Sequence, residues 1–483
     1  MDYISTRGRG EKVTPSYAIL KGIAFDGGLY VPTEFPQLFS KIPDISSLSY
    51  QELAFEVLSA FLTDFHADEL KRCITSAYTG TFKGDIVKQI RVGEHCFLEL
   101  FHGRTSAFKD VALSILPYLS MQSANMNNLK EEPVVLTATS GDTGKAALEA
   151  FADVPGTHIV VFFPEDGVSD IQKLQMKTQA GGNVLVVGIN GNFDQAQSGV
   201  KEIFGNVELN NRLHSAGYVL TSANSINIGR LLPQVVYYYY AYARMLKNGE
   251  ISAGEEIDFT VPTGNFGNIL AGWYAKKTGL PVARLICASN TNKVLYDFFT
   301  TQTYDKNRPF HKTASPSMDI LISSNLERFL YHKCGDPEYI RALMLGLVTD
   351  GRFDFTTDDD IVGSFADEEE ARRAIKRVYE RGYIIDPHTA VAYAAYEKLG
   401  GAGRKNVILA TASPYKFAEE VCTAIEGSEP GSFTAIERLS EIAKSVGYES
   451  APQAISELKN KPILHSKVCS VENMSDEILE FLL

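Results

Sequence analysis

F-H-G-R-T-S-A-F-K-D, residues 101–110, places a single lysine, Lys109, where an apolar run gives way to a helix. Residues 97–101 (F-L-E-L-F) have strand character, and residues 109–122 show the apolar spacing of a helix. The partial positive charge of a helix N-terminus disfavours an ammonium group and, with partial burial, lowers the pKa of the amine. A neutral amine can attack an aldehyde. The local sequence fits a solvated surface lysine at least as well, so the rest of the chain must decide.

The composition is that of a large soluble globular protein. The chain has 483 residues, of which 45% are hydrophobic and 22% are charged, and this length predicts about two to four domains. The formal net charge of −13 argues against a general nucleic-acid-binding surface. Small molecules are therefore the expected partners.

Cysteine usage and the apolar stretches predict a cytoplasmic protein. The six cysteines lie far apart and form no C-x-x-C pair, which favours reduced, buried thiols over disulfides or a zinc site. The N-terminal sequence M-D-Y-I-S-T-R-G-R-G-E-K contains no apolar signal region. The longest apolar stretch, residues 235–246, is rich in tyrosine and interrupted by Arg244. We therefore expect no membrane contact and no metal.

From about residue 96 the chain alternates short apolar runs, small-residue turns and helical patterns, as in an α/β fold with parallel sheets. The predicted strands are residues 133–138, 158–163, 183–189, 257–261, 283–288 and 406–410. The predicted helices are residues 143–152, 171–178, 193–204, 226–246 (bent or broken near Pro233) and 268–277. Ligands in such folds bind beyond the carboxyl ends of the strands.

Two regions differ from this alternation. Residues 1–95 open with the turn-rich sequence F-D-G-G-L-Y-V-P and continue with amphipathic helical sequence over residues 49–78, which predicts an N-terminal domain packed on the α/β body. In residues 367–381 acidic residues precede basic ones, and Glu368 with Arg372, like Glu369 with Arg373, has i,i+4 spacing. We predict a surface helix there.

The turn after the predicted strand 133–138 has the features of an anion site. It reads T-S-G-D-T-G-K, residues 139–145, and opens a helix whose free backbone N–H groups could hold a carboxylate or a phosphate. It is not a nucleotide phosphate loop, because G-x-x-x-x-G-K-[ST] requires glycine at Thr139 and a hydroxyl at Ala146. The turn suits a small carboxylate, and an ordinary capped turn is the alternative.

The sequence G-N-F occurs twice between a strand and a helix. Residues 191–193 precede Asp194, whose charge would cap the helix but repel a phosphate, so we interpret this turn as structural. Residues 262–268, P-T-G-N-F-G-N, carry no charge; two glycines allow close backbone approach and two asparagines can donate hydrogen bonds. This turn predicts a phosphate-binding loop, with a ligand-free glycine-rich helix start as the alternative.

A further turn, T-A-S-P-Y-K-F at residues 411–417, follows the predicted strand 406–410. Thr411 thereby places a neutral hydroxyl at the carboxyl end of a strand. Most threonines in such positions only cap a turn, so this feature gains meaning from the others.

Four motifs of the chain resemble those of the threonine synthases, pyridoxal-phosphate-dependent enzymes of fold-type II in the tryptophan synthase β-like family. In chain order, these motifs contain Lys109, residues 140–144, residues 264–268 and Thr411. The similarity extends to Y-I-S-T-R (3–7), D-G-G-L-Y-V-P (26–32), S-A-N-S-I-N-I-G-R (222–230) and D-P-H-T-A-V-A-Y (386–393). It covers nearly the whole chain and looks most like the longer microbial and fungal branch.

The resemblance implies a two-lobed α/β structure with parallel twisted sheets and an N-terminal extension domain. The N-terminal domain would cover residues 1–95, the catalytic region residues 96–425 and a C-terminal helical segment, packed on the larger lobe, residues 426–483. The smaller lobe would cover about residues 112–215, and the larger lobe the remainder of the catalytic region.

The resemblance also implies roles for individual residues. Lys109 would form the Schiff base with pyridoxal 5'-phosphate, and Thr411 would face the pyridine nitrogen, where a neutral hydroxyl leaves the ring a weaker electron sink. The cofactor phosphate would be bound by Gly264, Asn265, Phe266, Gly267 and Asn268. The substrate carboxylate would be bound by Ser140, Gly141, Asp142 and Thr143. Asp142 stands where relatives elsewhere in the fold often carry asparagine.

The implied reaction converts O-phospho-L-homoserine and water into L-threonine and phosphate, the last step of threonine biosynthesis, by γ-elimination and β-addition of water with Lys109 transferring protons. Arg230, Lys145 and Arg7, in that order, are candidates to bind the substrate phosphate; surface salt bridges are the alternative for the last two. His388 either supports the site from behind or is simply packed. A phospholyase or dehydratase releasing a 2-oxoacid stays open, as does the choice between monomer and homodimer.

Overall fold

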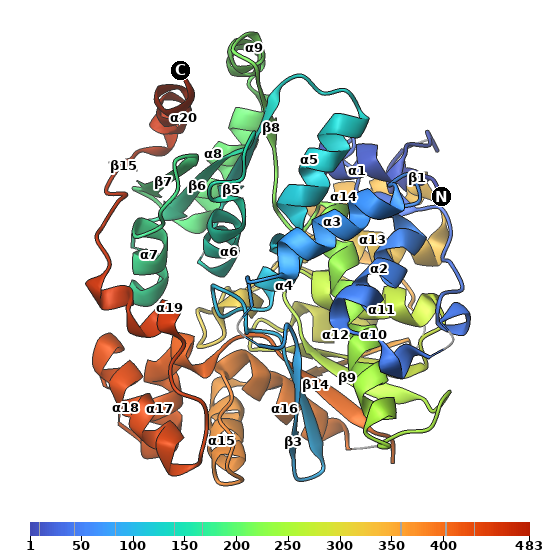
Figure 1. Cartoon of the computed structure of the whole chain (residues 1–483), viewed down its shortest axis with the longest axis vertical. Helices are drawn as coiled ribbons and strands as arrows, with labels where there is room; N and C mark the ends of the chain where they lie inside the picture. Colours follow the sequence, from blue (N-terminus) through green and yellow to red (C-terminus); the bar gives the residue numbers. More distant parts are fainter. Residues whose placement is uncertain are drawn as a thin grey trace.

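The computed structural model describes residues 1–8, 10–42, 44–82, 84–139, 141–166, 168–357, 360–400, 403–428 and 430–483. Two mostly parallel sheets with helices packed around them form the body, and the short helix that begins at Lys109 lies near the centre of the molecule (Figure 1). The α/β class and the parallel sheets expected from the sequence are confirmed. The six predicted strands are present, each to within one residue at either end.

The larger sheet has six strands in the order β13-β10-β9-β14-β4-β3. These are β13 (Ile361–Phe365), β10 (Val282–Ser289), β9 (Ile257–Pro262), β14 (Asn406–Ala410), β4 (His95–Glu99) and β3 (Lys88–Val92). Adjacent strands are parallel except β3 and β4, which form an antiparallel pair. The central strands β9 and β14 are buried along their whole length. After Asn406, β14 reads as an unbroken apolar run, as is typical of a strand covered on both faces, whereas β9 also carries Asp258 and Thr260.

The smaller sheet has five parallel strands in the order β15-β7-β6-β5-β8. These are β15 (Val468–Cys469), β7 (Val184–Ile189), β6 (His158–Pro164), β5 (Glu132–Ala138) and β8 (Tyr218–Thr221). Its helices are α6 (Asp142–Phe151), α7 (Asp170–Lys177), α8 (Phe193–Gly205) and α9 (Val207–Ser215). The turn predicted to bind a carboxylate therefore joins β5 to α6.

Two helix predictions need correction. The predicted helix 109–122 is divided into α4 (Lys109–Leu113) and α5 (Leu116–Met126). Pro117 lacks an N–H group and is tolerated only in the first turn of a helix, so a new helix starts just before it. The predicted helix 226–246 is observed as α10 (Ile228–Lys247), which includes Pro233.

The surface helix is α15 (Glu368–Tyr379), as predicted. Arg373 pairs with Glu369, but Arg372 pairs with Glu420 of α17 (Ala418–Glu426) at 2.6 Å rather than with Glu368. Of the two i,i+4 spacings, only that of Glu369 and Arg373 corresponds to a salt bridge. Arg372 has its longer-range partner on the neighbouring helix instead.

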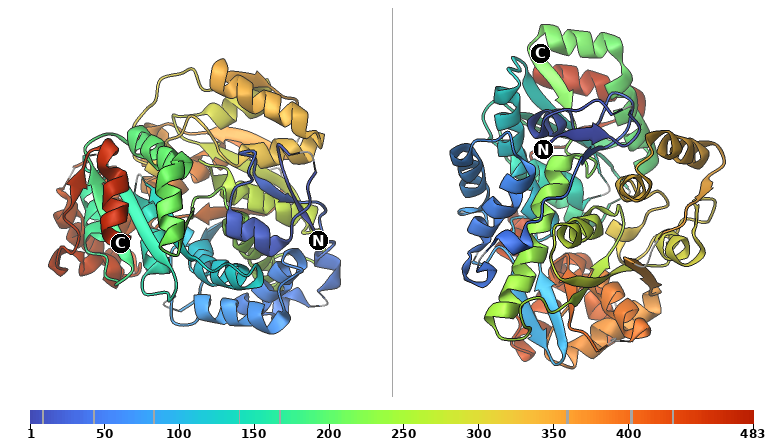
Figure 2. Two further views of the ribbon diagram at one scale, coloured as in Figure 1. Left: turned by 90° about the horizontal axis from the view of Figure 1, so that it is seen from above. Right: turned by 90° about the vertical axis from the view of Figure 1, so that its right-hand side faces the viewer.

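The N-terminal region packs against the larger lobe. Its elements are β1 (Tyr3–Ser5), α1 (Pro15–Lys21), β2 (Tyr30–Pro32), α2 (Tyr50–Phe61) and α3 (Ala67–Tyr78). The views in Figures 1 and 2 show these helices beside α10, and their apolar residues share one core with the tyrosine-rich middle of that helix, which includes Tyr237, Tyr238 and Tyr239. The tyrosine-rich stretch of the sequence is thus part of the hydrophobic core that joins the N-terminal region to α10.

The remaining elements of the larger lobe surround its sheet. They are α11 (Gly267–Lys277), α12 (Val294–Thr301), β11 (Thr303–Asp305), α13 (Leu326–Cys334), α14 (Pro337–Thr349), β12 (Arg352–Asp354) and α16 (Pro387–Leu399). In the described part of the chain, none of the helices combines the length and the apolar character that a bilayer span requires.

The C-terminal segment contacts both lobes. Helix α18 (Ser432–Ser445) shares a core with α15, α16 and α17 beside the larger sheet. After α19 (Gln453–Ser456) the chain passes to the smaller lobe, where β15 pairs with β7 and α20 (Met474–Leu482) packs into the core of that sheet (Figure 1). The sequence led us to expect the whole segment on the larger lobe; the structure places its last part on the smaller one.

Candidate functional site

The turn that carries Lys109 is hydrogen-bonded to the turn that carries Thr411. The N–H of Phe108 donates to the carbonyl of Thr411 at 2.8 Å, and the N–H of Ser413 donates to the carbonyl of Ser106 at 3.1 Å. Thr411 is buried at the carboxyl end of β14. The structure therefore brings together Lys109 and Thr411, which lie far apart in the sequence.

Asp110 fixes the shape of the lysine turn. Its carboxylate accepts from the N–H of Thr105 at 2.9 Å and from the Thr105 hydroxyl at 2.6 Å. Burial raises the pKa of Asp110 to about 6, against the lowering effect of these hydrogen bonds. A Cβ atom on Gly103 would lie 2.4 Å from the Asp110 Cβ, so glycine is required for the turn to close.

The amine of Lys109 is partly buried and lies among charged groups. Burial is the main cause that lowers the pKa of Lys109 to about 8, and the charges of Lys416 and Arg230 act in the same direction. The carboxylates of Asp142 and Asp110 act in the opposite direction. The Lys109 Nζ atom donates to the Ser317 hydroxyl at 3.4 Å. A sizeable fraction of the amine is therefore neutral near physiological pH, as nucleophilic attack requires.

The 264–268 loop packs closely against neighbouring backbone. Phe266 adopts the left-handed conformation (φ 65°), and α11 begins at Gly267, so the N–H groups of its first turn have no partners within the helix. The carbonyl of Asn265 accepts from the backbone and side chain of Asn325, both at 3.1 Å. A Cβ atom on Gly264 would lie 2.5 Å from the Ser317 carbonyl oxygen. Ser317 therefore connects this loop to Lys109.

Two buried donors beside this loop have no partner within the described residues. The Asn268 side-chain oxygen accepts from Tyr237 at 2.6 Å and from Tyr238 at 2.9 Å, which orients its Nδ2 group away from them. That Nδ2 atom and the Nε atom of Arg230 are buried without a hydrogen-bond partner. Unsatisfied buried donors are costly, and an anionic ligand would satisfy them.

Arg230 itself is a buried cation at the start of α10. Its Nη1 donates to the carbonyl of Ala223 at 2.7 Å, and none of its atoms forms an ion pair with a carboxylate in the part of the chain that the structure describes. Burial lowers the pKa of Arg230 to about 10, so the guanidinium stays charged at neutral pH. An anion is the ligand that this environment favours.

The turn between β5 and α6 is only partly available to a ligand. The Thr139 hydroxyl accepts from the N–H groups of Gly141, at 3.0 Å, and Gly144, at 2.9 Å. The expectation that the N–H groups of this turn are free therefore does not hold for Gly141. Thr143 is partly exposed at the start of α6, and Ser140 lies outside the described residues.

Asp142 is held by a lysine that the sequence did not indicate. The Lys416 Nζ atom lies 2.7 Å from Asp142 Oδ1, and the Gln172 side chain donates to the same carboxylate at 3.0 Å. Burial opposes ionisation, but the charges of Lys416 and Lys109 outweigh it and hold the pKa of Asp142 well below its usual range. Asp142 is therefore an ionised acceptor that cannot donate a hydrogen bond.

The other candidate cations are paired within the chain. The Lys145 amine lies 3.0 Å from Glu149 and also contacts Gln179. Arg7 forms a two-point ion pair with Glu327, at 2.6 and 2.8 Å. Both residues are thus in salt bridges, as the alternative interpretation expected, although Lys145 and the Glu327 partner of Arg7 are buried and not at the surface; Arg230 has no such pair within the described residues.

His388 supports the site from behind. Its Nε2 atom accepts from the N–H of Ser317 at 3.1 Å, so the ring proton must be on Nδ1, which lies 2.6 Å from Asp386. The ring is buried and packs edge-on against Phe417. Both nitrogens are therefore occupied, and the ring fixes the backbone of Ser317.

Three family models match the chain: "Threonine synthase N terminus" over residues 2–78, "Pyridoxal-phosphate dependent enzyme" over residues 88–413 and "Threonine synthase, C-terminal" over residues 389–462. The chain belongs to the threonine synthase family. A threonine synthase of Schizosaccharomyces pombe is 38% identical over 88% of this chain and 89% of its own length.

Solved structures agree with this assignment. A pyridoxal-phosphate-bound threonine synthase from Brucella melitensis superposes with a TM-score of 0.87 at 35% identity, covering all of this chain and 99% of that one. Threonine synthase from yeast gives a TM-score of 0.88 at 33% identity, covering all of this chain and 98% of that one. The protein is therefore a pyridoxal-phosphate-dependent enzyme of fold-type II.

The donor set of this threonine synthase family member fits the cofactor. Lys109 offers the amine, the Asn268 Nδ2 group and the first turn of α11 offer donors for a phosphate, and the neutral Thr411 hydroxyl lies at the end of β14. Sequence reasoning missed Ser317 and Lys416. The only signal for Lys416 was its place between two aromatic residues, Tyr415 and Phe417, within the turn that begins at Thr411.

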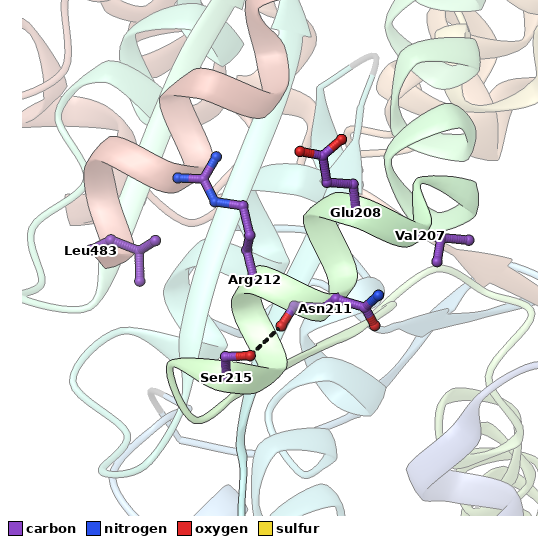
Figure 3. A pocket seen from close by; sticks show the side chains of 6 residues that line it. All are labelled: Val207, Glu208, Asn211, Arg212, Ser215 and Leu483. Carbon is purple, nitrogen blue, oxygen red and sulfur yellow. Dashed lines mark hydrogen bonds between the residues drawn. The ribbon is translucent and has the colours of Figure 1, made fainter.

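Two surface hollows are lined by described residues of the protein. One, of about 810 Å³, lies beside the lysine turn and is lined by His102, Arg104, Ser106, Lys145 and Lys461 among others. The other, of about 640 Å³, lies between α9 and the C-terminal Leu483 and contains none of the predicted site residues (Figure 3). The first is thus the hollow that adjoins the turn carrying Lys109.

Proposed function

We propose that the protein catalyses the conversion of O-phospho-L-homoserine and water into L-threonine and phosphate. The assignment to the threonine synthase family supports this reaction, and the charge distribution of the site supports the substrate. The observation that carries the proposal is the buried, unpaired guanidinium of Arg230 near an amine of lowered pKa, because this substrate brings a phosphate and an amino-acid backbone together. We further propose a cytoplasmic location, supported by six cysteines that are all free thiols.

We infer that Lys109, residues 264–268 and Thr411 hold the cofactor. The N–H groups at the start of α11 and the Asn268 amide would bind its phosphate, and the Thr411 hydroxyl would meet its ring nitrogen. Pyridoxal phosphate, when bound, stabilises negative charge that develops at the substrate carbons. The glycine at 264 lets the loop approach Ser317 closely.

We infer that the substrate lies between Arg230 and the start of α6. Arg230 would bind its phosphate through its guanidinium group, whose Nε atom has no hydrogen-bond partner within the described residues. Ser140, Gly141, Asp142 and Thr143 are the proposed carboxylate site, with the reservation that the Gly141 N–H already donates to Thr139. Asp142, being ionised, would orient donors of this site instead of meeting the carboxylate itself.

Lys109 is the proposed base for successive proton transfers. Its lowered pKa allows Nζ to accept the α-proton of the substrate and to return protons at neighbouring carbons as phosphate leaves and water adds. The Ser317 hydroxyl, 3.4 Å from Nζ, would keep the amine in position between these transfers. One base thus serves each step without a second titrating residue.

The domain limits inferred from the sequence remain our proposal. The family models over residues 2–78, 88–413 and 389–462 support an N-terminal domain over 1–95, a catalytic region over 96–425 and a distinct C-terminal segment over 426–483. Strands β5, β6 and β7 of the five-stranded sheet support a smaller lobe over about 112–215, whereas β8 and β15 of the same sheet lie outside these limits.

Incubation of the cofactor-loaded protein with O-phospho-L-homoserine tests this function. We expect equal amounts of L-threonine and inorganic phosphate, measured by amino-acid analysis and a phosphate assay. Release of phosphate with 2-oxobutyrate as the main carbon product would instead identify a phospholyase. A matched reaction with L-homoserine, which lacks the phosphate leaving group, should give neither product.

A further inference from the structure

Lys416 is a buried cation with no role in the reaction as described above. It lies in the short helix η4 (Pro414–Phe417), and its side chain is 0% exposed. Its Nζ atom lies 2.7 Å from Asp142 Oδ1 and donates to the carbonyl of Thr105 at 3.0 Å. An ammonium group is removed from water at a high free-energy cost unless a carboxylate compensates it. Asp142 supplies that compensation.

The contacts of Lys416 join three separate segments. Lys416 follows β14 of the larger sheet, Asp142 begins α6 on the smaller sheet, and Thr105 belongs to the turn that carries Lys109. The ion pair therefore connects both lobes to the catalytic turn. Asp142 is further held by Gln172 at 3.0 Å.

The same ion pair faces the amine of Lys109. The Ser317 hydroxyl lies between them, 3.4 Å from Lys109 Nζ and 3.5 Å from Asp142 Oδ2. The other charged groups that act on Lys109 are Arg230 of α10 and Asp110 of α4. Behind Ser317, the His388 ring has its nitrogens occupied by Ser317 and Asp386.

We propose that Lys416 is a positioning residue for the reaction: it fixes the Asp142 carboxylate at the start of α6 and compensates its charge, so that Lys109 faces a neutral pair and not a lone carboxylate. The proposal rests on the proposed function, because it assumes that Lys109 is the amine that holds the cofactor. Lys416 acts only through Asp142.

Removing the charge of Lys416 and removing the charge of Asp142 should shift the pKa of Lys109 in opposite directions. In Lys416→Met, the buried Asp142 carboxylate has lost its partner, and Lys109 becomes its closest available cation, which favours the protonated amine. In Asp142→Asn, the uncompensated Lys416 ammonium repels a second positive charge and favours the neutral amine. In the double variant both charges are absent, so the two effects largely cancel. A purely structural role would shift both single variants in the same direction or not at all.

The rate at which the cofactor-free, full-length chain captures pyridoxal phosphate measures this property, because only the neutral amine reacts. We would follow the appearance of the visible absorption band over a series of pH values. The midpoint of the rate profile should rise by about one unit in Lys416→Met and fall by about one unit in Asp142→Asn, within the range that a single nearby charge produces. Below the midpoint, one unit corresponds to a tenfold change in rate.

The double variant Lys416→Met/Asp142→Asn should return close to the parent midpoint. If Lys416→Met does not fold, the comparison of Asp142→Asn with the double variant decides: a higher midpoint in the double variant supports the proposal, and an equal or lower one overturns it. Equal shifts in both single variants, or no shift in either, also overturn it.

Two controls separate this inference from the proposed function. Lys173→Met, a lysine of α7 that pairs with Glu165, should leave the midpoint unchanged. Lys109→Ala should form no band at all; if it still does, the assignment of Lys109 fails, and with it the basis of the Lys416 proposal. If formation of the band requires Lys109 but the midpoint does not change when Lys416 or Asp142 is substituted, only the role of Lys416 is overturned.

Discussion

The Ser317 hydroxyl lies 3.4 Å from the Lys109 amine, although 208 positions separate the two residues in the chain. Ser317 is held in turn by His388, whose Nε2 atom accepts from its N–H group at 3.1 Å. A Cβ atom on Gly264 would lie 2.5 Å from the carbonyl oxygen of Ser317. One residue that carries no charge thus connects the proposed catalytic amine to the proposed phosphate loop.

Replacing Gly264 with alanine should disturb this connection. The new Cβ atom would lie 2.5 Å from the Ser317 carbonyl, so the loop or residue 317 must move. We expect a loss of about 1–3 kcal/mol in the free energy of unfolding, as in other overpacked sites, and weaker cofactor binding. Denaturant unfolding and titration with pyridoxal phosphate measure the two effects.

Gly267→Ala provides the matched control for stability. A Cβ atom there would lie no closer than 3.5 Å to the neighbouring side chains, which is ordinary contact. Its unfolding free energy should stay within about 0.5 kcal/mol of the parent, as for a substitution that makes no clash. Equal destabilisation by both substitutions would show that the approach to Ser317 is not what requires glycine at 264.

Arg230→Ala should weaken substrate binding without removing the cofactor. Loss of charge-assisted hydrogen bonds to a phosphate costs about 1.5–3 kcal/mol each, so we expect KM for O-phospho-L-homoserine to rise about tenfold to a hundredfold. The visible absorption of the bound cofactor should persist. Steady-state kinetics and the absorption spectrum measure these quantities.

Arg7→Ala tests the specificity of that effect. Arg7 is paired with Glu327, so its loss should lower stability and leave KM near the parent value. If instead Arg7→Ala raises KM and Arg230→Ala does not, the assignment of the phosphate site to Arg230 is wrong. The two arginines therefore serve as each other's control.

His388→Leu should reduce turnover through Ser317. The substitution removes the acceptor of the Ser317 N–H group and leaves Asp386 without its ring donor. We expect kcat to fall several-fold while Lys109 still captures the cofactor. His388→Gln, whose side-chain oxygen can accept the same hydrogen bond, should recover part of kcat. A loss of cofactor capture in both variants would mean that His388 acts on more than Ser317.

The pH dependence of cofactor capture follows from the environment of Lys109. Burial lowers the pKa of Lys109 to about 8, so the fraction of reactive neutral amine grows as pH rises through that value. The capture rate should therefore increase with pH and level off above about pH 9. A rate that still rises steeply above pH 10 would indicate an ordinary solvated lysine.

Local patterns predicted much of the fold. The strands were recognisable because buried strands such as β14 are covered on both faces and read as short, largely apolar runs. Lys109 and Thr411 were singled out because each follows a predicted strand, and the resemblance to the threonine synthases implied their roles. The structure brings their two turns together, because the carboxyl ends of parallel strands meet at one edge of a sheet.

Contacts between distant segments could not be predicted. Nothing in the sequence places Ser317 beside Lys109 or Lys416 beside Asp142, because these pairs depend on how the lobes and their loops pack. The same holds for Arg372, which local spacing assigned to Glu368 and packing assigns to Glu420. The Thr139 hydroxyl likewise accepts a hydrogen bond from the Gly141 N–H, which the sequence pattern alone predicted to be free.

The most direct test of the whole account is to find which residue holds the cofactor. Borohydride reduction of the cofactor-loaded protein, followed by proteolysis and mass spectrometry, identifies the lysine that carries the reduced cofactor. We predict a single modified peptide, with the added mass on Lys109. Modification of Lys416, Lys145 or any other lysine in place of Lys109, or no modified peptide from a protein that still turns over O-phospho-L-homoserine, would contradict the account.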